Sequence, residues 1–511
     1  MKAFLMFPEQ DFDWQRPLLP HHQPLIQDLE LNTLFQAMAQ DDDYIFEVSK
    51  KAVLASTRDV DVIRYRQSIL QDCLNNTAVV RAIYQIPIEA ILNKRRGWMG
   101  IYTSYPSGIL NSAVEMVQMF MELLKKLKQI ANTHAGQFQS EGFARFFAMI
   151  QTELNDDYFS LVQDHLKALK FRDGVLLSAT VGRGNEGTDY VLRQPNDNDQ
   201  NWLERVFSPK APVYSFRLHP RDDHGARAVA DLKNRGINLV ANALAQSSDH
   251  IDSFFKMLRA ELAFYVGCLN LADQLKQMGA PTAFPVPVDS TERRHTYGGL
   301  YDLCLALTLK QNIIGNDGAA DGKDLVMITG ANQGGKSTFL RSIGLAQLMM
   351  QCGLFVPADS FRANVCEAIF THFKREEDAS MTSGKLDEEL SRMSLIVDAI
   401  TPHSMLLFNE SFAATNEREG SEIGRQIISA LLEKRIKIFF VTHLYELAHG
   451  FYRRGMANAF FLRAERQEDG ERTFKVTRGS PLQTSFGIDL YNNIFGKDQA
   501  SLANLSNLRE T

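Results

Sequence analysis

Hydrophobic residues follow two different patterns on either side of residue 282. Upstream, apolar residues recur at helical spacing from Leu110 to Leu127, and a similar block covers residues 143–169. Downstream, short apolar runs alternate with longer amphipathic segments. The pattern therefore predicts a mainly helical region over residues 1–282 and an α/β domain over residues 283–511.

Two parts of the helical region stand out. Between about residues 172 and 220, alternating stretches at 175–177, 190–192 and 213–216 are separated by Gly, Asn, Asp and Pro, which predicts a small β insertion. Residues 226–278 contain no proline, which predicts a long helix over about this range. A continuous helix there would measure about 80 Å at 1.5 Å per residue. We expect either a break near Gly236 or an extended arm.

The second half alternates strand and helix patterns. Strands are predicted at residues 324–329, 405–408 and 436–441, and helices at residues 336–352 and 417–434. Because buried strands that alternate with helices form parallel sheets, we expect one parallel sheet with helices on both faces.

Composition and charge narrow the class of protein only modestly. The 511 residues are 45% hydrophobic and 23% charged, which excludes collagen-like and wholly disordered chains. A net charge of -6 excludes a surface that is positive throughout, but it leaves room for a local basic patch that binds nucleic acid. The five cysteines form no CxxC pair, and no apolar run approaches the ~18 residues of a membrane span. We therefore expect a cytoplasmic protein without a membrane segment.

One loop carries a nucleotide-binding motif. Residues 330–337 match GxxxxGK[ST] between a predicted strand and a predicted helix, which is the context that the motif requires. Backbone N–H groups of such a loop converge on phosphates, Lys336 reaches the β and γ oxygens, and the Ser337 hydroxyl ligates Mg²⁺. The predicted nucleotide-binding residues are Gly330, Ala331, Asn332, Gln333, Gly334, Gly335, Lys336, Ser337 and Thr338.

Two later strand ends supply candidate catalytic groups. The strand at 405–408 ends in Asn409 and Glu410, where Glu410 can orient or deprotonate water. Asn409 stands where an Asp normally supports Mg²⁺, and a neutral amide ligates a hard cation more weakly than a carboxylate. The strand at 436–441 is followed by His443, a candidate sensor of the γ-phosphate, with a structural role as the alternative. These residues predict bound ATP, weakened Mg²⁺ support and slow hydrolysis.

Together, these segments resemble the ATPase domain of the MutS mismatch-repair family. The resemblance covers about residues 283–500 and lies in the P-loop segment 328–358, a signature-loop segment 383–390, the stretches 408–420 and 441–448, and the TSFGI element at 484–488. It implies an ABC-like P-loop NTPase domain that uses ATP and Mg²⁺ and forms a homodimer. In that dimer, Ser383 would contact the partner's nucleotide in trans.

The resemblance is weaker upstream, in residues 66–74 and 261–272, and it implies a helical core, levers and a clamp-like region. Phe7 and Glu9 match the Phe-x-Glu string of the family's mismatch wedge, but a wedge must be held by a folded domain. We therefore expect a member without the N-terminal mismatch-recognition domain and without the Smr nuclease module.

Basic residues of the helical region are candidates for phosphate contacts, with an ordinary solvated face as the alternative for each cluster. The candidates are Lys94, Arg95, Arg96, Lys125, Lys126, Lys128, Arg217, Arg221 and Arg227.

The leading functional hypothesis is a MutS-family, ATP-dependent DNA-binding protein. ATP binding and weak hydrolysis in a homodimer would open and close a clamp on mismatched, branched or distorted double-stranded DNA, in mismatch repair or recombination, with a MutL-like partner. The alternative is a slowly hydrolysing, nucleotide-switched scaffold that recruits protein or ribosome partners. An unrelated ABC-type ATPase is disfavoured, because residues 383–385 read SGK where its signature reads SGGQ.

Overall fold

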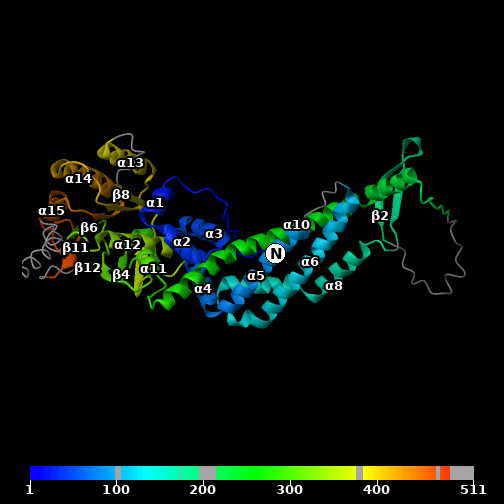
Figure 1. Ribbon diagram of the computed structural model, residues 1–511, viewed down its shortest axis with the longest axis horizontal. Coiled ribbons are helices and arrows are strands. Elements are labelled where there is room, and N and C mark those ends of the chain that lie inside the picture. The colour runs from blue at the N-terminus through cyan, green and yellow to red at the C-terminus, as the bar shows by residue number, and fades with distance from the viewer. Residues whose placement is uncertain (98–104, 173, 195–213, 376–383, 468–471, 484–511) are drawn as a thin grey trace, which may run out of the picture. The chain divides into compact units, whose positions relative to one another are not determined.

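The computed structural model describes the chain except for residues 98–104, 173, 195–213, 376–383, 468–471 and 484–511 (Figure 1). Contacts divide the chain into two compact units. The helical unit comprises Met1–Ala3, Ala78–Phe138 and Phe143–Arg259, and the α/β unit comprises Phe4–Thr77, Gln139–Gly142 and Ala260–Thr511. The first helices of the chain therefore belong to the same unit as the strands of the second half.

The helical unit contains the elements predicted from the apolar spacing. Its helices are α5 (Thr77–Gly97), α6 (Pro106–His134), α7 (Glu141–Glu153), α8 (Asp156–Ala168) and most of α10 (Asp223–Gln277), with short 3₁₀ turns η1 (Ala135–Gln137) and η2 (Arg183–Asn185). The predicted block at 143–169 forms two helices rather than one. Its interruption has a local cause, because the Asn155 side chain caps α8 by accepting a bond of 2.8 Å from the N–H of Tyr158.

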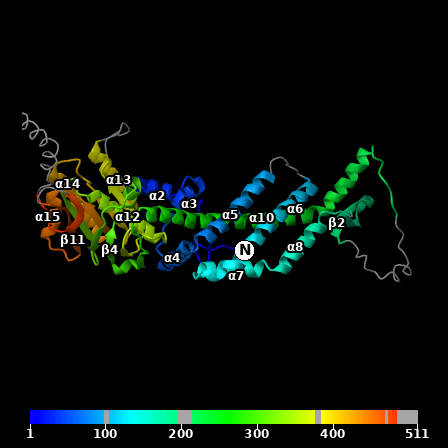
Figure 2. The same cartoon turned by 60° about the horizontal axis from the view of Figure 1, so that its bottom comes forward.

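The long helix α10 runs through 55 residues, and Figure 2 shows it as one continuous ribbon. Of the two expected alternatives, the long uninterrupted helix is confirmed, and the break near Gly236 is absent. A Cβ atom at Gly236 would collide with the side chain of Leu177, which lies on strand β1. Gly236 therefore allows close packing of a strand on the helix instead of ending the helix.

The predicted β insertion is confirmed as a two-stranded hairpin, β1 (Leu176–Val181) and β2 (Gly187–Arg193), paired antiparallel. The prediction of a strand over residues 213–216 is wrong for residues 214–216, which are the part that the structure describes. Tyr214 and Phe216 adopt no regular structure and are 91% and 80% exposed, so alternation of apolar residues did not mark a buried strand face there.

The α/β unit holds a six-stranded sheet of order β12-β11-β6-β10-β9-β8. Five neighbouring strands are parallel and β12 is an antiparallel edge, which confirms the predicted parallel sheet. The strands are β6 (Leu325–Gly330), β8 (Ile369–Phe373), β9 (Met405–Asn409), β10 (Lys437–Val441), β11 (Ala459–Arg466) and β12 (Arg472–Arg478).

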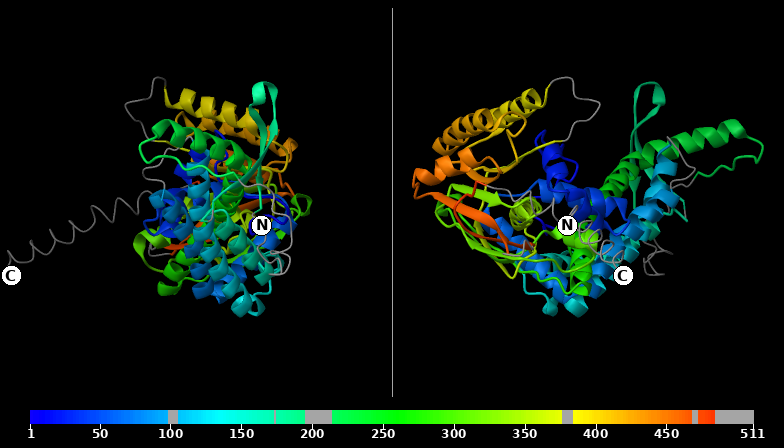
Figure 3. Two further views of the ribbon diagram at one scale, coloured as in Figure 1. Left: turned by 90° about the vertical axis from the view of Figure 1, so that its right-hand side faces the viewer. Right: turned by 60° about the vertical axis from the view of Figure 1, so that its left-hand side comes forward.

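Helices cover both faces of this sheet, as the continuous apolar runs predict. One face packs against α13 (Lys385–Ala399), α14 (Glu417–Glu433) and α15 (Tyr445–Arg453), which appear in yellow and orange in the right-hand view of Figure 3. Leu406, Phe408 and Phe440 belong to the core on that face. The opposite face receives α12 (Lys336–Gln351), where Gly344 lies against Leu407.

The remaining elements complete the α/β unit. A second sheet has the order β3-β7-β4-β5 and is made of β3 (Val286–Val288), β4 (His295–Leu300), β5 (Asn316–Ala319) and β7 (Ser360–Asn364). The helices are α1 (His22–Asp28), α2 (Leu31–Ala39), α3 (Asp43–Leu54), α4 (Val60–Asn75) and α11 (Leu303–Leu309), with the 3₁₀ turn η3 (Ser290–Glu292).

Buried polar side chains hold the N-terminal segment of the α/β unit. Glu261, on α10, accepts a hydrogen bond of 2.6 Å from the N–H of Leu5, and Tyr265 donates one of 2.5 Å to the Leu5 carbonyl. Arg66 donates to the Met6 carbonyl at 2.8 Å, and its guanidinium lies 4.4 Å from the centre of the Phe7 ring. The wedge-like string at Phe7 is therefore engaged in packing within its own unit.

All five cysteines are buried and free of disulfides. No helix in the described ranges is both long and apolar enough to cross a bilayer.

Candidate functional site

The GxxxxGK[ST] loop joins the internal strand β6 to the first turn of α12. Gly330, at the end of β6, has φ 114° and its missing Cβ would lie 2.8 Å from the backbone N of Ala464. Gly335, which immediately precedes α12, has φ 82°. Both glycines therefore occupy backbone conformations that residues with a side chain rarely adopt, and the loop can bring its N–H groups close together.

Lys336 is buried at the start of α12. Its Nζ donates to the carbonyl oxygens of Ala331 at 2.9 Å and Gly330 at 3.2 Å, so the side chain bends back over its own loop. Burial lowers the pKa of Lys336, while the carboxylate of Glu410 acts in the opposite direction.

The two candidate metal ligands, Ser337 at the start of α12 and Asn409 at the end of β9, lie next to each other. Ser337 donates its hydroxyl proton to Oδ1 of Asn409 at 2.8 Å. Asn409 ends β9 and is paired in register with Val441 of β10, so the carboxyl ends of these strands share the edge where the loop begins. The two oxygens that the sequence assigns to Mg²⁺ are therefore neighbours.

Glu410 and His443 form the second predicted pair. Oε1 of Glu410 lies 3.6 Å from Nδ1 of His443, and the two side chains are 29% and 37% exposed. The neighbouring His443 makes the largest contribution to lowering the pKa of Glu410, and Lys336 and Lys374 add to it. Glu410 is therefore ionised at neutral pH, as a group that accepts a proton from water must be.

A cavity of about 720 Å³ opens beside this cluster. Its polar wall comes from Gly335, Lys336 and other loop residues together with Glu410. Its other wall is largely apolar and was missed by the sequence analysis; it includes Leu305, Leu309, Ile313, Ile314 and Phe474. No motif marks these residues: the first four come from one segment, Phe474 comes from a distant one, and all have ordinary apolar side chains. Asn332, Gln333, Gly334, Ser337 and Thr338 also line the cavity.

The oxygens present fit Mg²⁺ only in part. Within the described residues, no group of three or more His, Cys, Asp or Glu side chains could hold a metal ion. Mg²⁺ in nucleotide sites takes one or two carboxylates and completes its shell with phosphates and waters. Ser337 and Asn409 offer two neutral oxygens, so phosphate oxygens would have to supply most of the charge.

Each predicted DNA-contacting lysine faces a carboxylate in the helical unit. Lys94 pairs with Asp252 at 2.9 Å, Lys125 with Glu122 at 3.0 Å, Lys126 with Glu89 at 2.9 Å and Lys128 with Asp156 at 2.6 Å. Arg95 and Arg96 are exposed in the last turn of α5. Arg217, Arg221 and Arg227 are exposed and form no ion pair with any described residue. Ser383 and the TSFGI element lie outside the described residues.

Comparison with known families agrees with this architecture. The family model of the MutS2 N-terminal domain matches residues 58–278, and that of MutS domain V matches residues 326–498. The second match contains the GxxxxGK[ST] loop, Asn409, Glu410 and His443.

Individual relatives carry related names. A DNA mismatch repair protein MutS of Thermotoga sp. (strain RQ2) is 36% identical over 162 residues, which are 32% of this chain and 20% of that protein. MutS protein homolog 4 of Homo sapiens is 27% identical over 307 residues, 58% of this chain and 31% of that protein. The matches thus span about a fifth to a third of these curated relatives.

The two family-model matches together cover most of the helical unit and the parallel sheet with its GxxxxGK[ST] loop, so the class of protein is that of the MutS proteins. The chain belongs to the MutS family.

Proposed function

We propose that this chain is an ATP-dependent DNA-binding protein whose α/β unit is an ABC-like P-loop NTPase domain. ATP binding and slow hydrolysis in a homodimer would open and close a clamp on mismatched, branched or otherwise distorted duplex DNA. The observation that carries the proposal is one cavity lined by the loop, Ser337 and Glu410, with Asn409 bonded to Ser337 and His443 lying 3.6 Å from Glu410. The relatives named for DNA mismatch repair support DNA as the ligand.

Each residue of the site has a task in this proposal. Loop N–H groups and the N-terminus of α12 would bind the phosphates, and Lys336 would leave the carbonyls of Gly330 and Ala331 to contact them. Glu410 would accept a proton from the attacking water, and His443 would hydrogen-bond the terminal phosphate. The apolar wall would exclude water from the remainder of the nucleotide.

Mg²⁺, when bound, would neutralise charge on the phosphates. Ser337 and Asn409 would hold it through neutral oxygens, and the missing Asp charge predicts weak Mg²⁺ support and a weak ATPase.

Dimerisation and domain division are parts of the same proposal. Ser383 would complete the partner's nucleotide site, so closing the dimer would depend on ATP.

A boundary near residue 282 would separate the helical core, lever and clamp-like region from the ATPase domain. The two family models, which match residues 58–278 and 326–498, support that position.

The helical unit would make the DNA contacts. Arg217, Arg221 and Arg227 are exposed, whereas the lysines at 94, 125, 126 and 128 already face carboxylates and would have to exchange them for phosphates. A MutL-like partner and a cytoplasmic, nucleoid-associated location would follow from DNA binding of this kind.

A nucleotide-switched scaffold is the second candidate, because Asn409 favours binding of ATP without rapid turnover. Such a scaffold would recruit protein or ribosome partners. Salt distinguishes the two candidates, since phosphate contacts cause a steep loss of DNA affinity as salt is added.

The test is a binding panel of homoduplex, mismatched, forked and four-way-junction DNA, each with ADP and with a non-hydrolysable ATP analogue. We expect salt-sensitive, nucleotide-dependent binding that favours branched DNA. A preference for the plain mismatch would overturn the ranking of substrates. A chain that stays monomeric with saturating ATP and shows no nucleotide-dependent DNA binding would overturn the proposal.

A further inference from the structure

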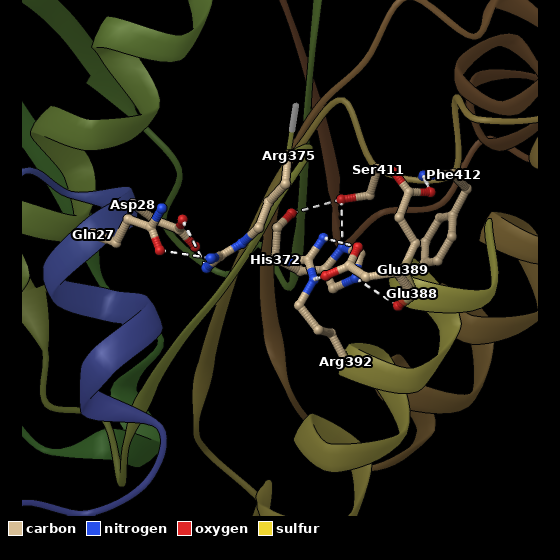
Figure 4. Close-up of polar contacts among 9 residues, drawn as sticks. All are labelled: Gln27, Asp28, His372, Arg375, Glu388, Glu389, Arg392, Ser411 and Phe412. Carbon is tan, nitrogen blue, oxygen red and sulfur yellow. Dashed lines mark hydrogen bonds and ion pairs between the residues drawn. The ribbon is translucent and has the colours of Figure 1, made fainter. Parts of the chain in front are cut away.

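A buried polar cluster joins helix α13 to the turn that carries Glu410. Its members are His372 on β8, Glu389 on α13, and Ser411 and Phe412 in the turn after β9, all of them drawn in Figure 4. Each is at most 3% exposed, and none lines the nucleotide cavity. The cluster therefore needs an explanation other than direct contact with a nucleotide.

His372 connects two backbone segments through its ring. Nε2 lies 3.0 Å from the carbonyl oxygen of Glu389, and Nδ1 lies 2.7 Å from Oγ of Ser411. Burial, with a contribution from the charge of Arg392, lowers the pKa of His372 to about 4, so the ring is neutral at pH 7. The Ser411 hydroxyl donates its one proton to the His372 carbonyl at 2.6 Å, and its oxygen also lies against Nδ1, so Ser411 contacts both the backbone and the ring of His372 on β8.

Glu389 contributes its carboxylate as well as its backbone. Oε2 accepts the N–H of Phe412 at 2.9 Å, and the Phe412 ring is stacked against the His372 ring at 5.4 Å between centroids. A charged carboxylate that accepts a buried backbone N–H makes a stronger bond than a neutral acceptor does. α13 is thus bonded to the turn directly at Phe412 and, through His372, at Ser411.

The backbone of this turn is strained on either side of Ser411. Glu410 has φ 54° and Phe412 has φ 64°, in the left-handed region that side-chain-bearing residues rarely occupy. Such conformations persist only where the surroundings fix them. The surroundings here are the N–H of Glu410, bonded to the Val441 carbonyl at 2.9 Å, and the cluster around Ser411.

We propose that Glu389 and Ser411 are positioning residues that hold the strained turn and thereby place the Glu410 carboxylate for hydrolysis. Through them, the position of α13 controls turnover without changing nucleotide binding. The inference rests on the hydrolysis assigned above to Glu410.

The experiment measures single-turnover ATP hydrolysis and ADP affinity for Glu389→Ala, Glu389→Gln and Ser411→Ala in the full chain. We expect at least a tenfold loss of turnover in the two alanine variants and less than a twofold change in ADP affinity, because Lys336 and its loop are untouched. Glu389→Gln retains an acceptor for Phe412 and should recover most of the turnover. Glu388→Ala is the matched control: Glu388 neighbours Glu389 on α13 but pairs with Arg392.

A double-mutant comparison separates positioning from general destabilisation. In a Glu410→Gln background, Glu389→Ala should cause no further loss of turnover, because it acts only through Glu410. Additive losses, or an equal loss in Glu388→Ala, would assign the cluster a merely structural role and overturn the inference. If Glu389→Ala fails to fold, the turnover and ADP affinity of Ser411→Ala, alone and in the Glu410→Gln background, test the positioning role.

The outcomes also separate this inference from the proposed function. A wild-type chain that does not hydrolyse ATP contradicts the hydrolysis on which both depend. A wild-type chain that hydrolyses ATP, with normal turnover in Glu389→Ala and Ser411→Ala, contradicts the positioning role alone.

Discussion

Asn409 is the residue at which this site departs most from the chemistry expected of a nucleotide pocket. Its side-chain oxygen accepts the Ser337 hydroxyl, so the two oxygens assigned to Mg²⁺ lie together while the negative charge of an Asp is missing. The difference between Asn and Asp at this position is therefore electrostatic rather than steric.

Restoring the charge should raise Mg²⁺-dependent hydrolysis. We expect Asn409→Asp to increase turnover by about tenfold at limiting Mg²⁺, which corresponds to about 1.4 kcal/mol of transition-state stabilisation. A steady-state ATPase titration with Mg²⁺ measures this change. Asn416→Asp is the control, because Asn416 caps α14 and Asp caps helices equally well. An unchanged or lower rate in Asn409→Asp contradicts our interpretation of Asn409.

Glu410 allows a complementary prediction about the chemical step. Glu410→Gln keeps the size and hydrogen-bonding capacity of the side chain but cannot take a proton. We therefore expect turnover to fall by about 10²–10⁴-fold with ADP affinity nearly unchanged. Rapid-quench hydrolysis and fluorescent-nucleotide titration measure the two quantities. Retention of turnover in Glu410→Gln means that another group activates the water.

The motif-bearing residues could be predicted because each depends on local spacing and a strand end. Lys336, Ser337, Asn409 and Glu410 needed only the order of strands and helices to be placed together. The apolar wall with Leu305 and Phe474 could not be predicted, because it forms only when distant segments pack. His372 was missed for the same reason: nothing in its own segment indicates Ser411 or Glu389.

At the scale of elements, Gly236 shows why a sequence rule can be correct in general and misleading in one place. Glycine lowers helix stability by about 1 kcal/mol relative to alanine, which favours a break in a long helix. Here the missing side chain makes room for Leu177, and the helix continues through it. Three strands of the parallel sheet, β6, β9 and β10, were predicted from their continuous apolar runs, whereas β8, β11 and β12 were not predicted.

Another part of α10 allows a prediction about pH. Burial raises the pKa of Glu261 to about 7, against the opposing bonds from the Leu5 and Phe12 N–H groups and with a smaller contribution from Asp11 in the same direction as burial. Its pKa is higher in the folded chain than in the unfolded chain. The folded state therefore binds the extra proton, and its stability falls as the pH rises from about 4.5 to about 7.

Glu261→Gln should remove this dependence. From pH 5 to pH 8, the free energy of unfolding of the variant should rise relative to that of the wild type. The full pKa shift of Glu261 corresponds to a rise of up to about 3 kcal/mol. Thermal unfolding at the two pH values measures the gain. Asp72→Asn is the comparison, because the Asp72 carboxylate also accepts backbone N–H groups, those of Gln139 and Ser140, but makes no hydrogen bond to Leu5 or Phe12. If the difference in unfolding temperature between the wild type and Glu261→Gln is the same at both pH values, the interpretation of Glu261 is wrong.

At the scale of the whole molecule, the two compact units are expected to divide the work between DNA and nucleotide. The helical unit includes Arg217, Arg221 and Arg227, which are exposed and form no ion pair with any described residue. The nucleotide cavity lies entirely within the α/β unit. Changes in the arginines should therefore alter DNA affinity and leave ATP binding intact.

Replacing all three arginines by alanine should weaken DNA binding most at low salt. If each contacts one phosphate, the slope of log affinity against log salt should decrease in magnitude by about 3. Fluorescence anisotropy across a salt series measures the slope. Lys126→Ala is the control, since Lys126 is already paired with Glu89. An unaltered slope in the triple variant places the DNA contacts elsewhere.

The burial of every cysteine has a practical consequence for following such changes in solution. Burial raises the pKa of the Cys352 and Cys366 thiols to about 12 and that of the other three thiols as well. Maleimide dyes react with thiolates, so the native chain should remain nearly unlabelled. A single cysteine introduced at Leu395, which is 70% exposed on α13, would then carry a dye at one known position, without removal of any natural thiol.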